Sequence, residues 1–190
     1  HPKWGGGGSL APQLALNDTS LLQLAQRLNG SLLRIGGSPA DFTAYDVYDG
    51  ACSADNLAKL VNSPPGSHYF CPIWNQTIGQ CLTMDRWAEI NNFALSTGLH
   101  IAMDLNACWG RNDSASTMNF SMIKGLFART AAMSAQGQSA VWAFEFGNEL
   151  YSNIQPARYG ADMLVLRELL SQAWTAAGAP SKTLPRLVGP

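Results

Sequence analysis

Short apolar segments alternate with longer amphipathic segments along this chain of 190 residues, and the alternation predicts strands and helices in turn. The short apolar runs expected to form strands are 32–36, 99–106, 141–149 and 186–189. The segments whose apolar residues recur at helical spacing are 20–28, 84–97, 116–135 and 156–177. Residues 38–82 are rich in Pro, Gly, Ser and Cys, so we expect a long irregular excursion there.

Residues at the ends of these segments favour the same assignment. Asp18 or Thr19 can cap the first helix, and Thr83 can cap the second. Gly98 is a suitable stop for the second helix, and Pro156 is a suitable first residue for the last one.

Strands that alternate with helices in this way predict an α/β fold with a parallel sheet. An open doubly wound sheet and a β/α barrel both fit the order of the elements. Polar residues follow the carboxyl ends of the predicted strands, at Gly37 to Asp41, at Asn106 and at Asn148-Glu149. Barrel enzymes build their active sites at that end of the sheet, although open sheets also bind ligands there.

The charge balance narrows the range of partners. Charged residues make up 13% of the chain, against about 25% in a typical soluble domain. The net charge of -1 gives no basic surface for nucleic acid, and no glycine-rich phosphate loop follows a strand. No run approaches the ~18 apolar residues of a membrane helix, so any membrane association is expected to be peripheral. The chain begins at His1 without Met, so we expect it to be processed or cut from a longer protein.

Five Asn-x-Ser/Thr sequons predict a glycoprotein of the secretory pathway, although a chance cluster is the alternative. They begin at Asn17, Asn29, Asn75, Asn112 and Asn119. Cys71 and Cys81 flank a short loop and are the expected disulfide. A metal site of His68, Cys71 and Cys81 is the rival interpretation, but it lacks a fourth close ligand, so we expect no metal and no cofactor.

The segment VWAFEFGNEL at 141–150 places two carboxylates and an asparagine at the end of an apolar strand. Alternation puts Glu145 and Glu149 on one side of the strand, and Asn148 with the large aromatic residues on the other. A carboxyl at the partly apolar mouth of a barrel resists ionisation, as a general acid must near neutral pH, which indicates Glu149. An acid that merely decorates the start of the next helix is the alternative.

A buried Glu145 requires a cationic partner, and Arg34 on the strand at 32–36 is the candidate. The alternative is that Arg34 points to a rim and binds water. Asp104 and Asn106 share a face of the strand at 99–106 and bring another acid into or near the same space.

Four segments in order carry a family resemblance: LRIGGSPAD at 33–41, QCLTMDRW at 80–87, DLNA at 104–107 and FEFGNEL at 144–150. They resemble the heparanase family, glycoside hydrolase family 79, and most of all its plant-type heparanase-like glucuronidases. A GNE motif alone would be weak, whereas four motifs in the same order over nearly the whole chain are specific.

The resemblance implies a (β/α)8 barrel with an added β-sandwich domain, and retaining hydrolysis of polysaccharides or proteoglycans that contain glucuronic acid. It implies that Glu149 is the acid/base and that Asn148 contacts the sugar beside the cleaved bond. It also implies that Asp41 helps to bind the terminal uronic acid and that Asn106 lines the cleft.

Two departures from the family pattern bear on this reading. The family usually has Gly where this chain has Asp104, which adds bulk and charge near Arg34 and Glu145. A retaining mechanism needs a second carboxylate about 5–5.5 Å from the first. In the family this carboxylate lies on a strand that comes after the last strand predicted here. We therefore expect residues 1–190 to form a partial barrel of about four strands, inactive alone, whose partner is the remainder of its own barrel.

The expected parent protein is a secreted β-glucuronidase or heparanase-like hydrolase, located outside the cell, in the cell wall or in a lysosome-like or vacuole-like compartment. The rivals are a non-catalytic carbohydrate-binding or interaction protein on a degraded barrel, and another barrel glycosidase with the same NE pair.

Overall fold

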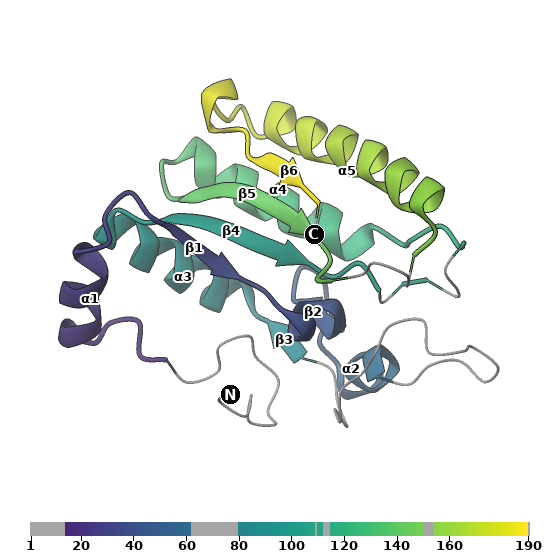
Figure 1. Cartoon of the computed structure of the whole chain (residues 1–190), viewed down its shortest axis with the longest axis horizontal. Coiled ribbons are helices and arrows are strands. Elements are labelled where there is room, and N and C mark those ends of the chain that lie inside the picture. The colour runs from purple at the N-terminus through teal and green to yellow at the C-terminus, as the bar shows by residue number, and fades with distance from the viewer. Residues whose placement is uncertain (1–13, 62–79, 109, 112–114, 150–153, 190) are drawn as a thin grey trace.

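A computed structural model of the chain describes residues 14–61, 80–108, 110–111, 115–149 and 154–189. Four parallel strands form its main sheet in the order β1-β4-β5-β6 (Figure 1). Their bounds are β1 Leu32–Ile35, β4 His100–Leu105, β5 Val141–Phe146 and β6 Arg186–Val188. A second parallel pair, β2 Thr43–Tyr45 and β3 Gln80–Leu82, lies beyond the carboxyl ends of the main strands (Figure 1).

Helices connect the strands of the main sheet and cover one of its faces. The helix α3 precedes β4, α4 lies between β4 and β5, and α5 lies between β5 and β6. Figure 1 shows α3 and α4 behind the sheet, with α5 packed beside α4. The bounds of the α-helices are α1 Thr19–Gln26, α2 Ala54–Val61, α3 Met84–Thr97, α4 Ser121–Ala135 and α5 Pro156–Ala176. The two short 3-10 helices of the described residues are η1 Ser38–Phe42 and η2 Ser181–Thr183.

The caps predicted from the sequence are present. Asp18 accepts a hydrogen bond from the backbone N–H of Leu21, and Thr83 accepts one from that of Arg86. Gly98 ends α3 in the left-handed conformation, with φ 70°, which a residue without Cβ adopts at little cost. The helix α4 begins at Ser121, later than the expected 116, because the Asn119 side chain accepts from the Ser121 N–H and forms a turn first.

The core lies between the main sheet and its helices. The aromatic rings of Phe144 and Phe127 pack with centroids 4.8 Å apart, and both side chains are fully buried. Trp87 of α3 is also buried and donates its indole N–H to the Thr130 hydroxyl of α4 at 3.0 Å. This packing leaves the opposite face of the sheet for polar residues.

Two sequence-based expectations need correction here. The described part of 38–82 is not wholly irregular, because it contains β2, α2 and β3. Both of these strands have three residues that are all buried, so they show no alternation of polar and apolar positions. On α1, Leu24 and Leu28 are exposed, although their spacing predicted a buried face.

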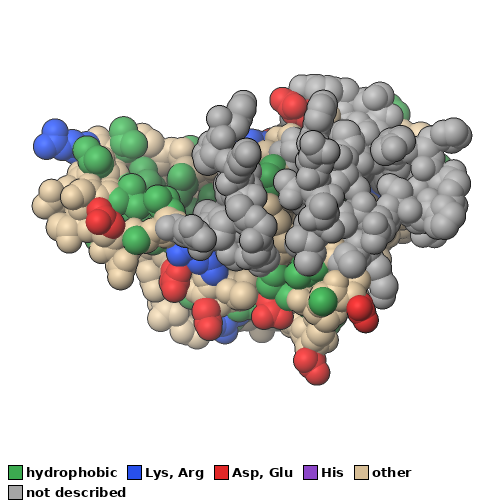
Figure 2. All heavy atoms as spheres, turned by 90° about the horizontal axis from the view of Figure 1, so that it is seen from below, with side chains coloured by type: hydrophobic (Ala, Val, Ile, Leu, Met, Phe, Trp, Pro, Cys, Tyr) green, Lys and Arg blue, Asp and Glu red, His purple; other side chains and the backbone are tan. Residues whose placement is uncertain are grey.

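One described face of the molecule carries little concentrated charge (Figure 2). Figure 2 views the molecule from beneath Figure 1, and the described part of that face shows acidic and basic side chains dispersed among neutral ones. Within the described residues, no helix combines the length and the apolar character needed to cross a bilayer.

Candidate active site

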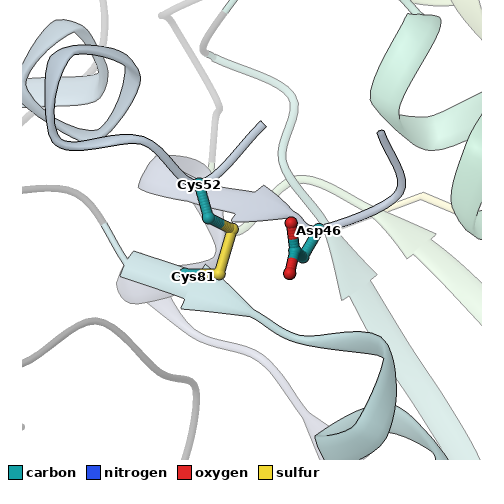
Figure 3. Close-up of side chains that lie close together, drawn as sticks. All are labelled: Asp46, Cys52 and Cys81. Atoms are coloured by element: carbon teal, nitrogen blue, oxygen red, sulfur yellow. A yellow bond between two sulfur atoms is a disulfide. The ribbon is translucent and has the colours of Figure 1, made fainter. Parts of the chain in front are cut away.

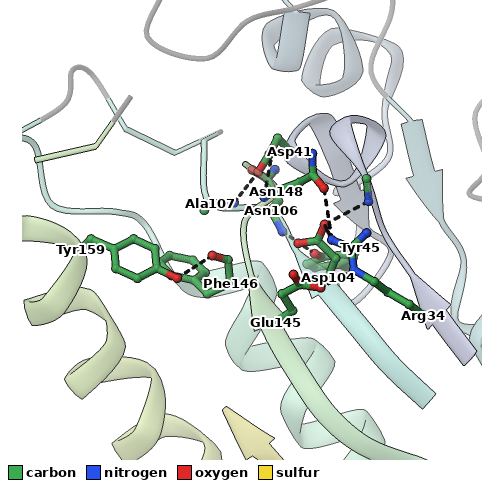
Figure 4. A network of polar contacts seen from close by, with 11 residues as sticks. Arg34, Asp41, Tyr45, Asp104, Asn106, Ala107, Glu145, Phe146, Asn148 and Tyr159 are labelled. Atoms are coloured by element: carbon green, nitrogen blue, oxygen red, sulfur yellow. Dashed lines mark hydrogen bonds and ion pairs between the residues drawn. The ribbon is translucent and has the colours of Figure 1, made fainter. Parts of the chain in front are cut away.

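Arg34 of β1 gathers three acceptors on the face of the sheet opposite the helices (Figure 4). Its Nε donates to Glu145 Oε2 at 2.6 Å, and its Nη2 donates to Asp104 Oδ2 at 3.4 Å and to Asn148 Oδ1 at 3.1 Å. Asp104 and Glu145 are direct neighbours in the β4–β5 register, so two acids lie side by side and need a cation between them. The hydrogen bond with Glu145 raises the pKa of Arg34.

Asp104 is the deepest acid of this group, with a fully buried side chain. Its Oδ2 also accepts from the backbone N–H of Gly37 at 3.1 Å, while its Oδ1 has no hydrogen-bond partner among the described residues. Burial raises the pKa of Asp104 to about 8, and the charge of Asp41 acts in the same direction. The carboxyl is therefore disposed to hold a proton near neutral pH.

Asp41 follows β1 through the Gly36-Gly37 turn and lies in η1. It is 8% exposed, and its two oxygens accept backbone N–H groups from two different loops. Oδ1 accepts from Ala107 at 3.3 Å, and Oδ2 accepts from Asn148 at 3.4 Å. Burial raises the pKa of Asp41 to about 7, against the opposing effect of these two donors.

Glu149, the predicted acid/base, lies beyond β5 and is exposed. The strand ends at Phe146, and both Gly147 and Glu149 adopt positive φ, at 81° and 53°. This turn interrupts the alternation of sides that the sequence predicted for 141–149. The Asn148 side chain consequently points to Arg34, on the same side as Glu145, and not to the side of the aromatic residues as expected.

Asn106 lies next to Asp41 and Asn148 in Figure 4, so the structure brings together the polar residues predicted to follow the strands. It is buried, and its amide holds local backbone in place. Its Nδ2 donates to the Thr43 carbonyl at 3.2 Å, and its Oδ1 accepts from the Cys108 N–H at 2.9 Å. A contact between Asn106 and a sugar stays a prediction.

The supporting roles of three further residues were not predicted from the sequence. Tyr159 of α5 donates its hydroxyl to the Phe146 carbonyl at 2.8 Å, at the end of β5. Arg111 donates its Nε to the Ala107 carbonyl at 2.8 Å and pairs through Nη2 with Asp162 of α5 at 2.5 Å. Asp162 lies three residues after Tyr159 and four before Leu166, so the helical period does place it on the buried face.

The predicted Cys71–Cys81 disulfide is wrong, because Cys81 is bonded to Cys52 (Figure 3). Parallel pairing of β2 with β3 brings the turn that carries Cys52 beside the strand that carries Cys81. Asp46 lies close to the two sulfurs, but disulfide sulfurs are not thiolate ligands, so this group does not form a metal site. His68 and Cys71 lie outside the described residues.

The sequon residues Asn17, Asn29 and Asn119 are exposed, while Asn75 and Asn112 lie outside the described residues. A pocket of ≈ 450 Å³ lies between the segment before α1 and α3, lined by residues that include Leu16, Arg86 and Phe93. It shares no residue with the polar network around Arg34.

We compared the chain with curated proteins and with models of protein families. A search of curated proteins found no match. The model of the family described as "Glycosyl hydrolase family 79, N-terminal domain" matches residues 3–190, which is nearly the whole chain. The family resemblance and the fold class predicted from the sequence are thereby confirmed, and the four-stranded parallel sheet is part of a (β/α) barrel. The chain therefore belongs to glycosyl hydrolase family 79.

Proposed function

We propose that the full-length protein is a retaining β-glucuronidase or heparanase-like hydrolase in which Glu149 is the acid/base. The observation that carries the proposal is the position of Glu149, which is exposed beyond the carboxyl end of β5, directly after an asparagine fixed by Arg34. A glycoside hydrolase of the barrel type places its catalytic groups at this end of the sheet. Membership of glycosyl hydrolase family 79 supports the reaction class.

In this mechanism Glu149 donates its proton to the glycosidic oxygen as the bond to the anomeric carbon breaks. A second carboxylate, outside this chain, attacks that carbon and forms a glycosyl–enzyme ester. Glu149, now a carboxylate, then removes a proton from water, which cleaves the ester and regenerates both groups.

Asn148 is the proposed contact to the sugar beside the cleaved bond. Because Arg34 donates to Asn148 Oδ1, the amide orientation is set and Nδ2 is the group left to donate to a sugar hydroxyl. Glu145 accepts from Arg34 Nε, and Asp104 accepts from the same Nη2 that binds Asn148, so the guanidinium is itself held in place. Asn106 is the further proposed lining residue of this cleft.

The proposed substrates are polysaccharides or proteoglycan glycans that contain glucuronic acid. The proposed location is outside the cell, in the cell wall, or in a lysosome-like or vacuole-like compartment. The Cys52–Cys81 disulfide supports an oxidising compartment, and the exposed sequon residues Asn17, Asn29 and Asn119 are accessible to glycosylation.

The test compares Glu149→Gln with wild type in the full-length protein, using β-glucuronides with activated aryl and with poor leaving groups. A general acid is typically worth about 10²–10⁴-fold, so we expect a loss of that size on poor leaving groups and a much smaller loss on activated ones. Glu168→Gln, at an exposed position on α5, is the matched control and should leave both rates unchanged.

Equal losses on both substrates would remove the acid/base role from Glu149. A wild-type protein that hydrolyses β-xylosides or β-glucosides but no β-glucuronide would point to another NE-type glycosidase. Binding of glucuronic-acid glycans without turnover of any glycoside would point to a non-catalytic carbohydrate-binding protein.

A further inference from the structure

The carboxyl of Asp104 joins two parts of the candidate site that follow different strands. Its Oδ2 accepts from the backbone N–H of Gly37 at 3.1 Å and from Arg34 Nη2 at 3.4 Å (Figure 4). Gly37 directly precedes η1, which carries Asp41. The same Nη2 of Arg34 donates to Asn148 Oδ1 at 3.1 Å, beyond the end of β5. One oxygen therefore contacts both the turn before Asp41 and the guanidinium that binds Asn148.

The turn between β1 and η1 is fixed from the neighbouring strand. Gly37 has φ 96°, a conformation that glycine adopts easily because it has no Cβ, but glycine also has the most backbone freedom to lose. Within the turn the Gly37 carbonyl accepts from the Ala40 N–H at 2.8 Å. The Gly37 N–H is bound by Asp104 of β4. This contact therefore helps to set the direction in which η1 and Asp41 leave the sheet.

We propose that Asp104 is a positioning residue for substrate binding, which acts on the two predicted sugar contacts, Asp41 and Asn148. It acts on the first through the Gly37 turn and on the second through Arg34. The proposal rests on the proposed function and on the sugar contact that the resemblance implies for Asp41, which stays a prediction. Asp104 does not touch the substrate itself, because its side chain is fully buried. The family usually has Gly at this position, which offers no side-chain acceptor, so the role is a departure of this chain from the family pattern.

Asp104 can make both contacts as a neutral acid. Its Oδ2 accepts both donors, while its Oδ1 has no hydrogen-bond partner among the described residues. A proton on Oδ1 therefore leaves the two contacts intact. Burial raises the pKa of Asp104 to about 8, which favours the neutral form at neutral pH. The titratable and charged groups that interact with this carboxyl are Arg34 of β1, Asp41 of η1, Tyr45 of β2, Glu145 of β5 and Tyr159 of α5.

The neutral form also suits an anionic sugar. Asp104 and Glu145 are neighbours in the β4–β5 register, and both contact a single guanidinium, that of Arg34. Ionisation of Asp104 adds a second negative charge beside that guanidinium, which weakens the attraction of the site for a uronate. We therefore expect the affinity for a uronate to fall as the pH rises through the range in which Asp104 ionises.

The first experiment does not depend on activity. In the full-length protein, the backbone amide of Gly37 and the side-chain amide of Asn148 are followed by NMR between pH 5 and 9. We expect both signals to share a titration step with a midpoint near 8, and Asp104→Asn to remove that step. Signals that respond neither to the pH in this range nor to the substitution would overturn the proposal. Asp49→Asn, at an exposed position, is the matched control.

The second experiment measures the binding of glucuronic acid, the sugar released in the proposed reaction, to the full-length protein by calorimetry. At pH 6, Asp104→Ala removes both contacts and should raise Kd about tenfold, as the loss of a hydrogen bond to a charged group typically does. Asp104→Asn keeps an acceptor oxygen for both donors, so its Kd should stay within about threefold of wild type. Asp49→Ala should bind as wild type does.

The pH dependence of binding is the second readout. Between pH 6 and pH 9, the Kd of wild type should rise more than that of Asp104→Asn, because the amide does not ionise. This comparison also decides the matter if Asp104→Ala does not fold, since an equal rise in both proteins would overturn the proposal.

A merely structural Asp104 gives a different result. In that case Asp104→Ala changes the free energy of unfolding but leaves Kd for glucuronic acid unchanged, which would overturn the proposal. Equal increases of Kd in the Ala and Asn variants at pH 6 would also overturn it. A wild-type protein that neither binds glucuronic acid nor hydrolyses β-glucuronides would refute the proposed function, while the NMR signals would still decide whether Asp104 holds the turn and the Asn148 amide.

Discussion

An alanine Cβ at Gly36 would lie 2.4 Å from the Cβ of Asp104 and 2.7 Å from its Oδ2. Gly36 directly follows β1, and Asp104 lies in the neighbouring strand β4. The Gly37 N–H and Arg34 also bind the Asp104 carboxyl at this point. The acid in β4 therefore has room because the residue at the end of β1 has no side chain.

Gly36→Ala is expected to destabilise the protein by about 1–3 kcal/mol, because overpacking forces side chains or backbone to move. Urea unfolding of the full-length protein measures this loss. Gly160→Ala in α5 is the matched control, since a Cβ there meets nothing within 4 Å and Ala is the better helix former. Adding Asp104→Gly to Gly36→Ala should restore part of the loss; no restoration would show that the clash is elsewhere.

Stability is expected to fall as pH rises through the range in which Asp104 ionises. The folded pKa of about 8 lies above the value of about 4 in an unfolded chain. Between these values the folded state binds more protons, so the contribution is complete below about pH 4 and is lost as pH rises through about 8. Arg34, Asp41 and Glu145 are the charged groups that face this carboxyl.

Asp104→Asn tests this dependence, because an amide stays neutral and can keep the contacts to Gly37 and Arg34. The loss of unfolding free energy between pH 5 and pH 8 should be smaller in the variant than in wild type by about 1 kcal/mol or more. The same loss in both proteins would show that Asp104 does not titrate in this range. Asp49→Asn, at an exposed position, should behave as wild type.

Much of the main sheet and its helices could be predicted from the sequence. The apolar runs of β1, β4 and β5 stand out in the sequence, and the helix α3 is bounded by the caps Thr83 and Gly98, whose local chemistry does not depend on the rest of the fold. The strands β2 and β3 could not be found in this way, because three buried residues carry no period. The pairing of Cys81 with Cys52 depends on those two strands and was therefore missed as well.

The candidate site was predictable in part for similar reasons. A charge on a buried strand needs a partner, and this reasoning leads to the Arg34–Glu145 pair that the structure contains. The side to which Asn148 points could not be read from alternation, since Gly147 and Glu149 both turn the backbone to positive φ. The double contact of Asp41 depends on where two loops meet in space, which no local pattern contains.

The Cys52–Cys81 disulfide closes a sequence separation of 29 residues, for which loop entropy predicts a stabilisation of about 3–4 kcal/mol. Replacement of both cysteines by alanine should lower the unfolding free energy by up to that amount. Peptide mapping of the unreduced wild-type protein should recover a Cys52–Cys81 cross-link. Recovery of a Cys71–Cys81 peptide instead would contradict the structure.

The buried pair of Arg111 and Asp162 is expected to tie the loop after β4 to α5, the helix that follows the Glu149 loop. Both side chains are fully buried, and Arg158 adds a second contact to Asp162 at 2.9 Å. Removal of one partner leaves a buried charge without compensation, which typically costs about 3–5 kcal/mol. Asp162→Ala should therefore destabilise the protein by that amount in urea unfolding.

Two comparisons separate this effect from ordinary truncation. Glu89→Ala removes an exposed partner of Arg86 and should cost less than about 1 kcal/mol, as surface pairs usually do. The double variant Arg111→Met with Asp162→Leu leaves Arg158 at the half-buried end of the helix and removes the two deepest charges. It should be more stable than Asp162→Ala alone, because apolar side chains of similar volume replace the unpaired charge. If Asp162→Ala costs no more than Glu89→Ala, the pair does not hold the loop to α5.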